Sequence, residues 1–305
     1  MIVFRACCLL IVSGVVFGPG TAFGQSAGET DSTRAKSGSQ FLIPLGSIAL
    51  PGLGQYLHHV PLLGAGLTGT AVLGVGITQI GDVGGVFSGS LPREWRDQFS
   101  FEGAHLWFTA GGLSAWDAFH RAMPALQAEG RYGFLTTTDD VGDLLTAPFD
   151  VRFLGRWTTW VNMALTTLVA GIVVTQREDG VDHYPYRGHD AVFTGAVSYN
   201  AGVGEEALFR GWLLPLFHQT TGERFWIANG LQAGLFAAGH IEQAGAFAIA
   251  ISGWALYQGW LTRRNDWSIR ESIFHHFWYD VAAVTATFIA DEQPVARLTF
   301  PTIRF

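Results

Sequence analysis

The sequence has little charge and almost no lysine. Of its 305 residues, 14% are Asp, Glu, Lys or Arg, and Lys36 is the single lysine. A soluble domain carries about 25% charged residues, so this surface lacks many of the groups that keep a protein in water. With no basic stripe along the chain, a nucleic-acid partner is not expected. The net charge of −7 is spread over loops and isolated positions and identifies no partner.

Cysteine is also nearly absent. Cys7 and Cys8 are the only two, and both lie in an apolar run that follows Arg5 and ends at a Gly-Pro-Gly break. Small residues are then spaced as at a secretory cleavage site. We expect residues 1–24 to be a signal peptide, or an uncleaved anchor, and the polar residues 25–40 to be a flexible tether. Cleavage would leave no disulfide, thiol nucleophile or cysteine metal ligand.

Apolar residues, by contrast, are abundant and fall into long blocks. They make up 49% of the chain, and the blocks reach about 18 to 25 residues, the length that crosses roughly 30 Å of hydrocarbon. Strand-type alternation is missing, so we predict an all-α polytopic membrane protein with about eight transmembrane helices. The predicted segments are 41–56, 62–80, 105–123, 157–174, 191–217, 225–242, 244–262 and 269–290. The first contains Pro44 and Pro51, so it is either a kinked span or a re-entrant segment.

The arginines predict the orientation of these segments, because the side richer in Arg is usually cytoplasmic. With eight spans, the richer side holds Arg131, Arg152, Arg156, Arg224, Arg263, Arg264 and Arg270. The other side holds Arg93, Arg96, Arg177 and Arg187. This arrangement also leaves residues 25–40 outside, as a signal sequence requires.

Three parts follow the tether. Residues 41–180 form N-terminal membrane helices of unknown role, joined by a polar loop at 83–102 and a longer connection at 124–155. Residues 190–290 hold four closely spaced segments, whose short connections predict an antiparallel packed core. Residues 291–305 are a C-terminal tail.

Charged residues stand out in segment 191–217, where Glu205, Glu206 and Arg210 interrupt an apolar helix. Each charge at the centre of a span costs roughly 2.5–3.5 kcal/mol, so the three must face protein or a wet cavity. Glu206 and Arg210 are four residues apart and can pair. Glu205 lies about 100° around the helix and has no local partner, which would leave it free to act as a general base on water.

Other helices carry groups that can meet this cluster. His240 lies near the end of segment 225–242, and His276 and Asp280 share one face of segment 269–290. Counting about 1.5 Å per residue from the predicted cytoplasmic ends places Glu205, His240 and His276 at depths of roughly 12 to 22 Å. We therefore expect these three side chains to meet inside the bilayer.

The three motifs together resemble the CPBP family. They read Glu205-Glu206-x-x-x-Arg210, Phe236-x-x-x-His240 and His276-x-x-x-Asp280, in the family's order and on its four-helix core. This family contains the type II CAAX prenyl endopeptidases and bacteriocin-processing or immunity (Abi-like) proteins. The resemblance covers about residues 190–290.

The resemblance implies a role for each residue. Glu205 and His240 would activate the attacking water, Glu206 and Arg210 would orient the site, and His276 with Asp280 would stabilise the oxyanion or hold a metal. The family often has Asn at the last position, and an ionised carboxylate cannot donate to an oxyanion as an amide can. His240, His276, Glu205 and Asp280 are acceptable zinc ligands, but the HExxH helix is missing. A zinc-dependent and a metal-free mechanism both stay open.

The implied activity is hydrolysis of a peptide bond in a membrane-embedded or membrane-tethered substrate, within the lipid bilayer. The secretory signal favours a bacterial inner membrane and argues against a prenylated substrate. Two alternatives remain: a non-catalytic membrane interaction or immunity protein, and an ion- or proton-coupled transporter. Asp117 and His120 in the third segment either extend a polar cavity or mark a helix end near water, and His275 points away from His276.

Overall fold

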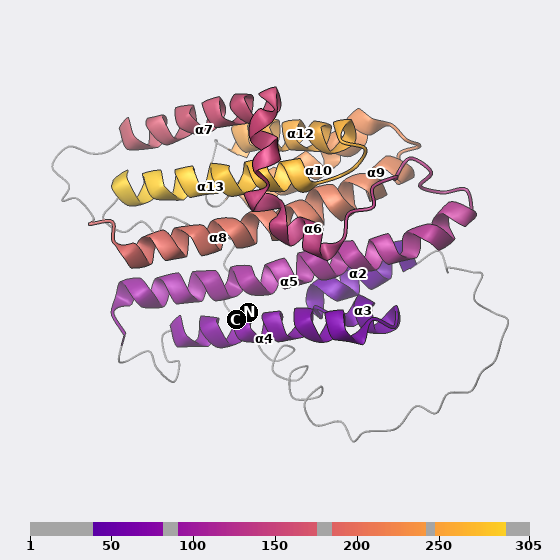
Figure 1. Ribbon diagram of the computed structural model, residues 1–305, viewed down its shortest axis with the longest axis horizontal. Helices are drawn as coiled ribbons and strands as arrows, with labels where there is room; N and C mark the ends of the chain where they lie inside the picture. The colour runs from indigo at the N-terminus through magenta and orange to yellow at the C-terminus, as the bar shows by residue number, and fades with distance from the viewer. Residues whose placement is uncertain (1–38, 82–90, 176–184, 242–247, 291–305) are drawn as a thin grey trace, which may run out of the picture.

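Long helices lying side by side form this molecule, shown in Figure 1. The computed structural model describes residues 39–81, 91–175, 185–241 and 248–290, and every regular element within these ranges is helical. The predicted all-α class is therefore confirmed for this part of the chain. The signal peptide, nearly all of the tether and the tail at 291–305 lie outside the described residues.

The first predicted segment is two short helices, α2 (Ser39–Ala49) and α3 (Leu53–Leu57). They are separated at Gly52, whose φ of +99° lies in the left-handed region that glycine adopts at low cost. The 11 residues of α2 rise only about 17 Å, whereas the hydrocarbon core is about 30 Å thick. No continuous span therefore covers residues 41–56, and the count of eight transmembrane helices stays a prediction.

The next two helices pack against each other as a hairpin: α4 (Pro61–Gly81) and α5 (Arg93–Ala128). Our prediction of a polar loop over 83–102 was wrong for residues 93–102, which form the first turns of α5. Polar residues there find partners on a later helix: Gln98 donates to Asp190 over 2.6 Å, and Asn200 donates to Glu102. These hydrogen bonds satisfy Gln98 and Glu102, which the sequence alone placed in a polar loop.

The long connection after α5 is also partly helical. It contains α6 (Val141–Thr146), η1 (Ala147–Phe149) and η2 (Val151–Gly155), and it leads into α7 (Trp157–Thr175). Asp140 and Asp143 form a reciprocal capping box at the start of α6, which satisfies two backbone donors that a helix start leaves open.

The second half agrees closely with the predicted segments. Its elements are α8 (Gly188–Glu206), η3 (Ala207–Leu213), α9 (Leu214–Thr220), α10 (Phe225–Gly239), α12 (Ala248–Arg264) and α13 (Arg270–Ala290). Helix α8 lies between α5 and α13 (Figure 1) and packs on both. A single helical path thus runs from Gly188 to Thr220 through the centre of the bundle.

Among the described helices, only α4 is both long and apolar enough to meet the usual criterion for a membrane span. Of its apolar window, 28% is buried inside the molecule. The helices of the second half contain polar and charged residues turned toward one another, which lowers their mean hydropathy.

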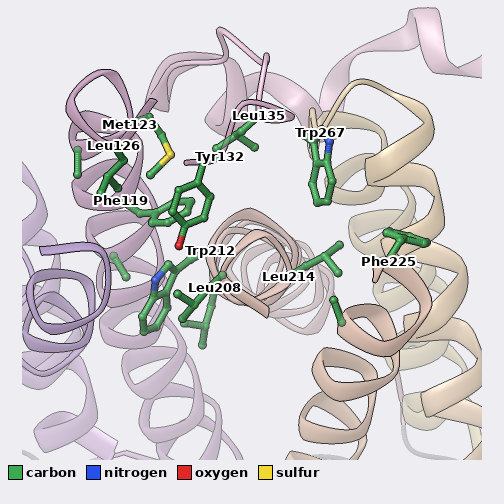
Figure 2. Packing of buried hydrophobic residues seen from close by; sticks show 14 residues of the cluster. Phe119, Met123, Leu126, Tyr132, Leu135, Leu208, Trp212, Leu214, Phe225 and Trp267 are labelled. Atoms are coloured by element: carbon green, nitrogen blue, oxygen red, sulfur yellow. The ribbon is translucent and has the colours of Figure 1, made fainter. Parts of the chain in front are cut away.

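Large apolar side chains from several helices and loops pack into one cluster, as Figure 2 shows. It joins Phe119 of α5, Tyr132 and Leu135 of the following loop, Trp212 of η3 and Trp267 before α13. The cluster ties the N-terminal helices to the central helical path. Burying an aromatic side chain of this size stabilises a protein by roughly 1.5–3 kcal/mol.

Glycines bring neighbouring backbones unusually close to α8. A Cβ at Gly204 would lie 2.7 Å from the Cα of Thr109, and a Cβ at Gly202 would lie 3.0 Å from the backbone nitrogen of Phe277. Thr109 also donates to the carbonyl of Asn200 over 2.7 Å. Helices α5 and α13 therefore rest directly on the turn of α8 that precedes Glu205.

We predict that Gly204→Ala lowers the unfolding midpoint of the detergent-solubilised protein, because the added methyl group forces α5 away from α8. The expected cost is about 1–3 kcal/mol, as for overpacking elsewhere. Gly195→Ala on the same helix is the matched control, since its Cβ would meet nothing within 4 Å. Equal midpoints for the two variants would contradict the close approach.

Candidate active site

Two glutamates end α8 where the backbone widens into the π-helical segment η3. Such π-helical turns are rare and are frequent at functional sites. Arg210 lies within η3, and its Nη1 donates to Oε1 of Glu206 over 2.8 Å. Both side chains have 0% exposure, so the predicted pair exists and is buried inside the bundle.

His276 of α13 is the second partner of Glu206. Its Nδ1 lies 2.8 Å from the same Oε1 atom that Arg210 contacts. Because the carboxylate held by Arg210 is an acceptor, we assign the hydrogen of this bond to Nδ1 of His276. Glu206 thus connects η3 to α13 and fixes the orientation of the imidazole.

Glu205 lies beside this network without joining it. It is 2% exposed, and its Oε2 atom is buried without a hydrogen-bond partner in the described residues. The nearest basic groups are Nε2 of His276 at 3.8 Å and Nε2 of His240 at 4.0 Å. The two glutamates therefore differ in kind, because one carboxylate is engaged and the other faces two imidazoles across a gap too long for a hydrogen bond.

His240 follows the last residue of α10 and is held by its own helix. Its Nδ1 lies 2.7 Å from the carbonyl oxygen of Phe236, and its ring stacks on that phenyl ring with centroids 4.6 Å apart. A carbonyl can only accept, so Nδ1 carries a hydrogen, and in the neutral ring Nε2 holds the lone pair. That lone pair is on the nitrogen nearest Glu205.

Asp280 and His240 form the accessible side of the cluster. Oδ2 of Asp280 is 3.4 Å from Nε2 of His276, and the side chains of Asp280 and His240 are 21% and 20% exposed. The side chains of Glu206 and Arg210, at 0%, form the closed side. A substrate would therefore meet His240 and Asp280 first.

An aromatic wall covers the buried arginine. The guanidinium of Arg210 lies 4.3 Å from the ring centroid of Phe236 and 5.5 Å from that of Trp254. Trp254 also meets the ring of His276 edge-on at 4.9 Å. These contacts help to compensate the desolvated charge through the negative faces of the rings.

One residue outside the predicted set, Asn162, orients this wall. Asn162 of α7 accepts from Nε1 of Trp254 over 3.1 Å and donates to the carbonyl of His275 over 3.2 Å. Asn162 is fully buried. In the sequence, it could have been noticed only as a single amide side chain within an apolar segment. His275 faces α7, where its Nε2 lies 3.0 Å from the hydroxyl of Thr159, so it is separate from the cluster, as its sequence position suggested.

Sequence reasoning also missed His105 of α5. This residue is 2% exposed, its Nδ1 bonds the carbonyl of Phe101 at 3.0 Å, and it interacts electrostatically with Asp280 and His240. It lies on the face of α5 that carries Glu102 and Thr109, both bonded to α8. The N-terminal helices thus contribute a buried imidazole next to the cluster.

Asp117 and His120, by contrast, lie elsewhere. Asp117 pairs with Arg121 at 2.7 Å and accepts from Gln55 over 2.8 Å. These bonds fix α3 against α5. His120 lines a separate cavity of about 240 Å³, so neither residue extends the polar cluster around Glu205.

The donor types of the cluster suit zinc, which binds imidazole nitrogen and carboxylate oxygen. Their arrangement does not, since no three His, Cys, Asp or Glu side chains in the described ranges are grouped to hold a metal ion. The predicted ligand set of His240, His276, Glu205 and Asp280 stays a prediction.

Residues 187–282 match the family model described as type II CAAX prenyl endopeptidase, Rce1-like. This segment is similar to that family, and we name it the Rce1-like domain after the match. It runs from the start of α8 into α13 and contains all six predicted site residues. No curated protein and no solved structure matches the chain. His105 and Asn162 lie outside the Rce1-like domain, so the N-terminal helices and α7 complete its surroundings.

We predict that His105→Ala lowers the peptidase kcat expected of an Rce1-like domain by about tenfold while the unfolding midpoint changes little. The matched control is His120→Ala on the same helix. His120 makes the same bond to the carbonyl four residues before it, at 2.9 Å, and stacks on Trp116. Equal kcat losses for both variants would show that His105 acts only through the stability of α5. His105→Asn, which keeps a donor near Nδ1, should restore part of the rate.

Proposed function

We propose that this chain is an intramembrane endopeptidase that hydrolyses a peptide bond of a membrane-associated protein or peptide. The observation that carries the proposal is the difference between the two glutamates. Glu206 is occupied by Arg210 and His276, whereas Oε2 of Glu205 is buried, lacks a hydrogen bond and faces the Nε2 atoms of His240 and His276. The match to the Rce1-like family supports the same reaction class.

In this mechanism, water binds between Glu205 and His240. The gap of 4.0 Å between Oε2 and Nε2 is too long for a direct hydrogen bond, and a water beside both atoms could donate to each. Glu205 takes a proton from the water, and the oxygen of this water attacks the carbonyl carbon of the substrate. The carbonyl oxygen then carries the negative charge of the tetrahedral intermediate.

In the proposed mechanism, His276 stabilises that charge. Its Nδ1 is committed to Glu206, so the nitrogen turned toward the accessible side is Nε2. With Nε2 protonated, the ring donates to the oxyanion. Collapse of the intermediate breaks the C–N bond, and the proton held by Glu205 passes to the leaving amine. Glu206 and Arg210 take no proton in this scheme; they hold His276 in position.

We further propose that the site works in a bacterial inner membrane on a membrane-embedded or membrane-tethered peptide. The apolar composition, the span-like helix α4 and the family of the Rce1-like domain support a membrane location. The apparent secretory signal at the N-terminus is the reason for choosing a bacterial membrane, and it disfavours a prenylated substrate.

We expect Glu205→Gln to abolish cleavage, with kcat lower by at least about 100-fold, because the amide has no basic oxygen to accept the proton of water. Comparative proteomics of cells carrying the wild type or the variant should reveal a processed membrane protein that appears only with the wild type. The purified wild-type chain should then cut that protein, and the variant should not.

Glu129→Gln is the matched control, since this exposed glutamate at the end of α5 lies outside the cluster. If Glu205→Gln left both the proteome and the purified activity unchanged, the protease proposal would fail. Full cellular function without cleavage would point to an interaction or immunity protein. Solute flux that depends on Glu206 would point to a transporter.

A further inference from the structure

A second polar site lies at the end of the bundle where α12 ends and α13 begins. A cavity of about 360 Å³ opens there between η2, Arg156 just before α7, and the turn from α12 to α13. Four arginines line it: Arg152, Arg156, Arg264 and Arg270. The family motifs include none of them, and all four fall on the side that the sequence predicts to be cytoplasmic.

Two carboxylates hold three of these arginines in place. Glu271 is 1% exposed and bonds Arg156, together with Thr158 and Asn265. Asp150 pairs with Arg152 at 2.7 Å and with Arg270 at 3.0 Å. The hydrogen bond from Arg152 lowers the pKa of the Asp150 carboxyl, so this anchor stays ionised at neutral pH.

The arginines still have donors to spare. Arg264 forms no ion pair with the described residues, and its guanidinium lies over Trp157 and Trp260 at 5.5 and 5.6 Å. Arg152 is 74% exposed. The lining holds four arginines against three carboxylates, the third being Asp266. Asp143 beside the cavity also pairs with Arg270, at 3.5 Å, so arginines and carboxylates are equal in number here. Asp150 engages only Nε and Nη2 of the Arg152 guanidinium. Arg152 and Arg264 therefore keep donors that an anion can use.

An exposed apolar belt borders the arginines. Val151, Leu154, Trp157 and Trp160 are 70%, 44%, 57% and 62% exposed, and they alternate along the chain with Arg152 and Arg156. Aromatic residues beside basic residues are typical of the boundary between lipid headgroups and acyl chains. Basic pockets between helices at this boundary bind anionic headgroups.

We propose that this arginine-lined cavity binds the phosphate of an anionic phospholipid. Arg152 and Arg264 donate to the phosphate oxygens, for which the planar guanidinium is well suited, while Trp157 and Trp160 contact the glycerol and upper acyl chain. The exposed apolar belt favours a lipid over free phosphate, because a small anion would leave these side chains in water.

The bound lipid would also set the position of the catalytic cluster. The cavity includes Arg270 and Glu271 at the start of α13, and His276 follows five residues after Glu271, about 7.5 Å along the helix. A headgroup anchored here fixes the depth of α13 in the bilayer, and with it the depth of His276 and Asp280.

The test uses the full-length protein in detergent micelles and measures its unfolding midpoint while phosphatidylglycerol is added. We expect a rise of about 3 °C or more at saturation, with no such rise for phosphatidylcholine or for inorganic phosphate. Arg264→Gln and Arg152→Gln should each remove at least about half of the rise.

Arg263→Gln is the matched control. Arg263 neighbours Arg264 at the end of α12, but its guanidinium lies over Phe225 at 4.5 Å, away from the cavity, so this variant should respond as the wild type does. An equal response of the Arg263 and Arg264 variants would overturn the proposal. So would a rise with inorganic phosphate as large as that with phosphatidylglycerol, since the site would then recognise a free anion.

Discussion

The structure depends on one buried ion pair, between Glu206 and Arg210. Two charges without exposure would be costly in a membrane interior, and three contacts compensate them: the mutual bond of 2.8 Å, the imidazole of His276 at 2.8 Å and the ring of Phe236 at 4.3 Å. Each contact involves a different helix. The need to compensate these two charges therefore positions α10 and α13 around η3. The same arrangement of helices positions the carboxylate of Glu205, which has no hydrogen bond at Oε2 within the described residues.

Much of the candidate site could be predicted from the sequence, because helical spacing alone places Glu206 against Arg210 and turns Glu205 to another face of the helix. The family motifs supplied His240 and His276. His105 and Asn162 could not be found this way, since each is an isolated polar residue whose partner lies far along the chain. An interruption of segment 41–56 was expected from Pro44 and Pro51, but its place at Gly52 depends on a backbone angle that composition does not reveal. The early start of α5 was missed, because it depends on tertiary contacts.

The candidate catalytic cluster and the arginine-lined cavity are parts of one helix arrangement. Helix α13 carries Arg270 and Glu271 at one end and His276 and Asp280 further along, and α7 contacts both regions through Thr158 and Asn162. Lipid bound at the cavity would therefore hold the same helix that carries His276, the residue proposed to stabilise the oxyanion. A protease of this kind would act fully only when seated in a membrane with anionic headgroups.

The central claim is that Glu205 is kept unpaired for chemistry while Glu206 holds the structure together. Unfolding midpoints of Glu205→Gln and Glu206→Gln, measured side by side in the same detergent, test it most directly. Glu205→Gln should match or exceed the wild type, because it removes a buried charge that has no hydrogen bond. Glu206→Gln should lower the stability by about 3–5 kcal/mol, because Arg210 is left without its counter-charge. Equal destabilisation by both variants would contradict the account.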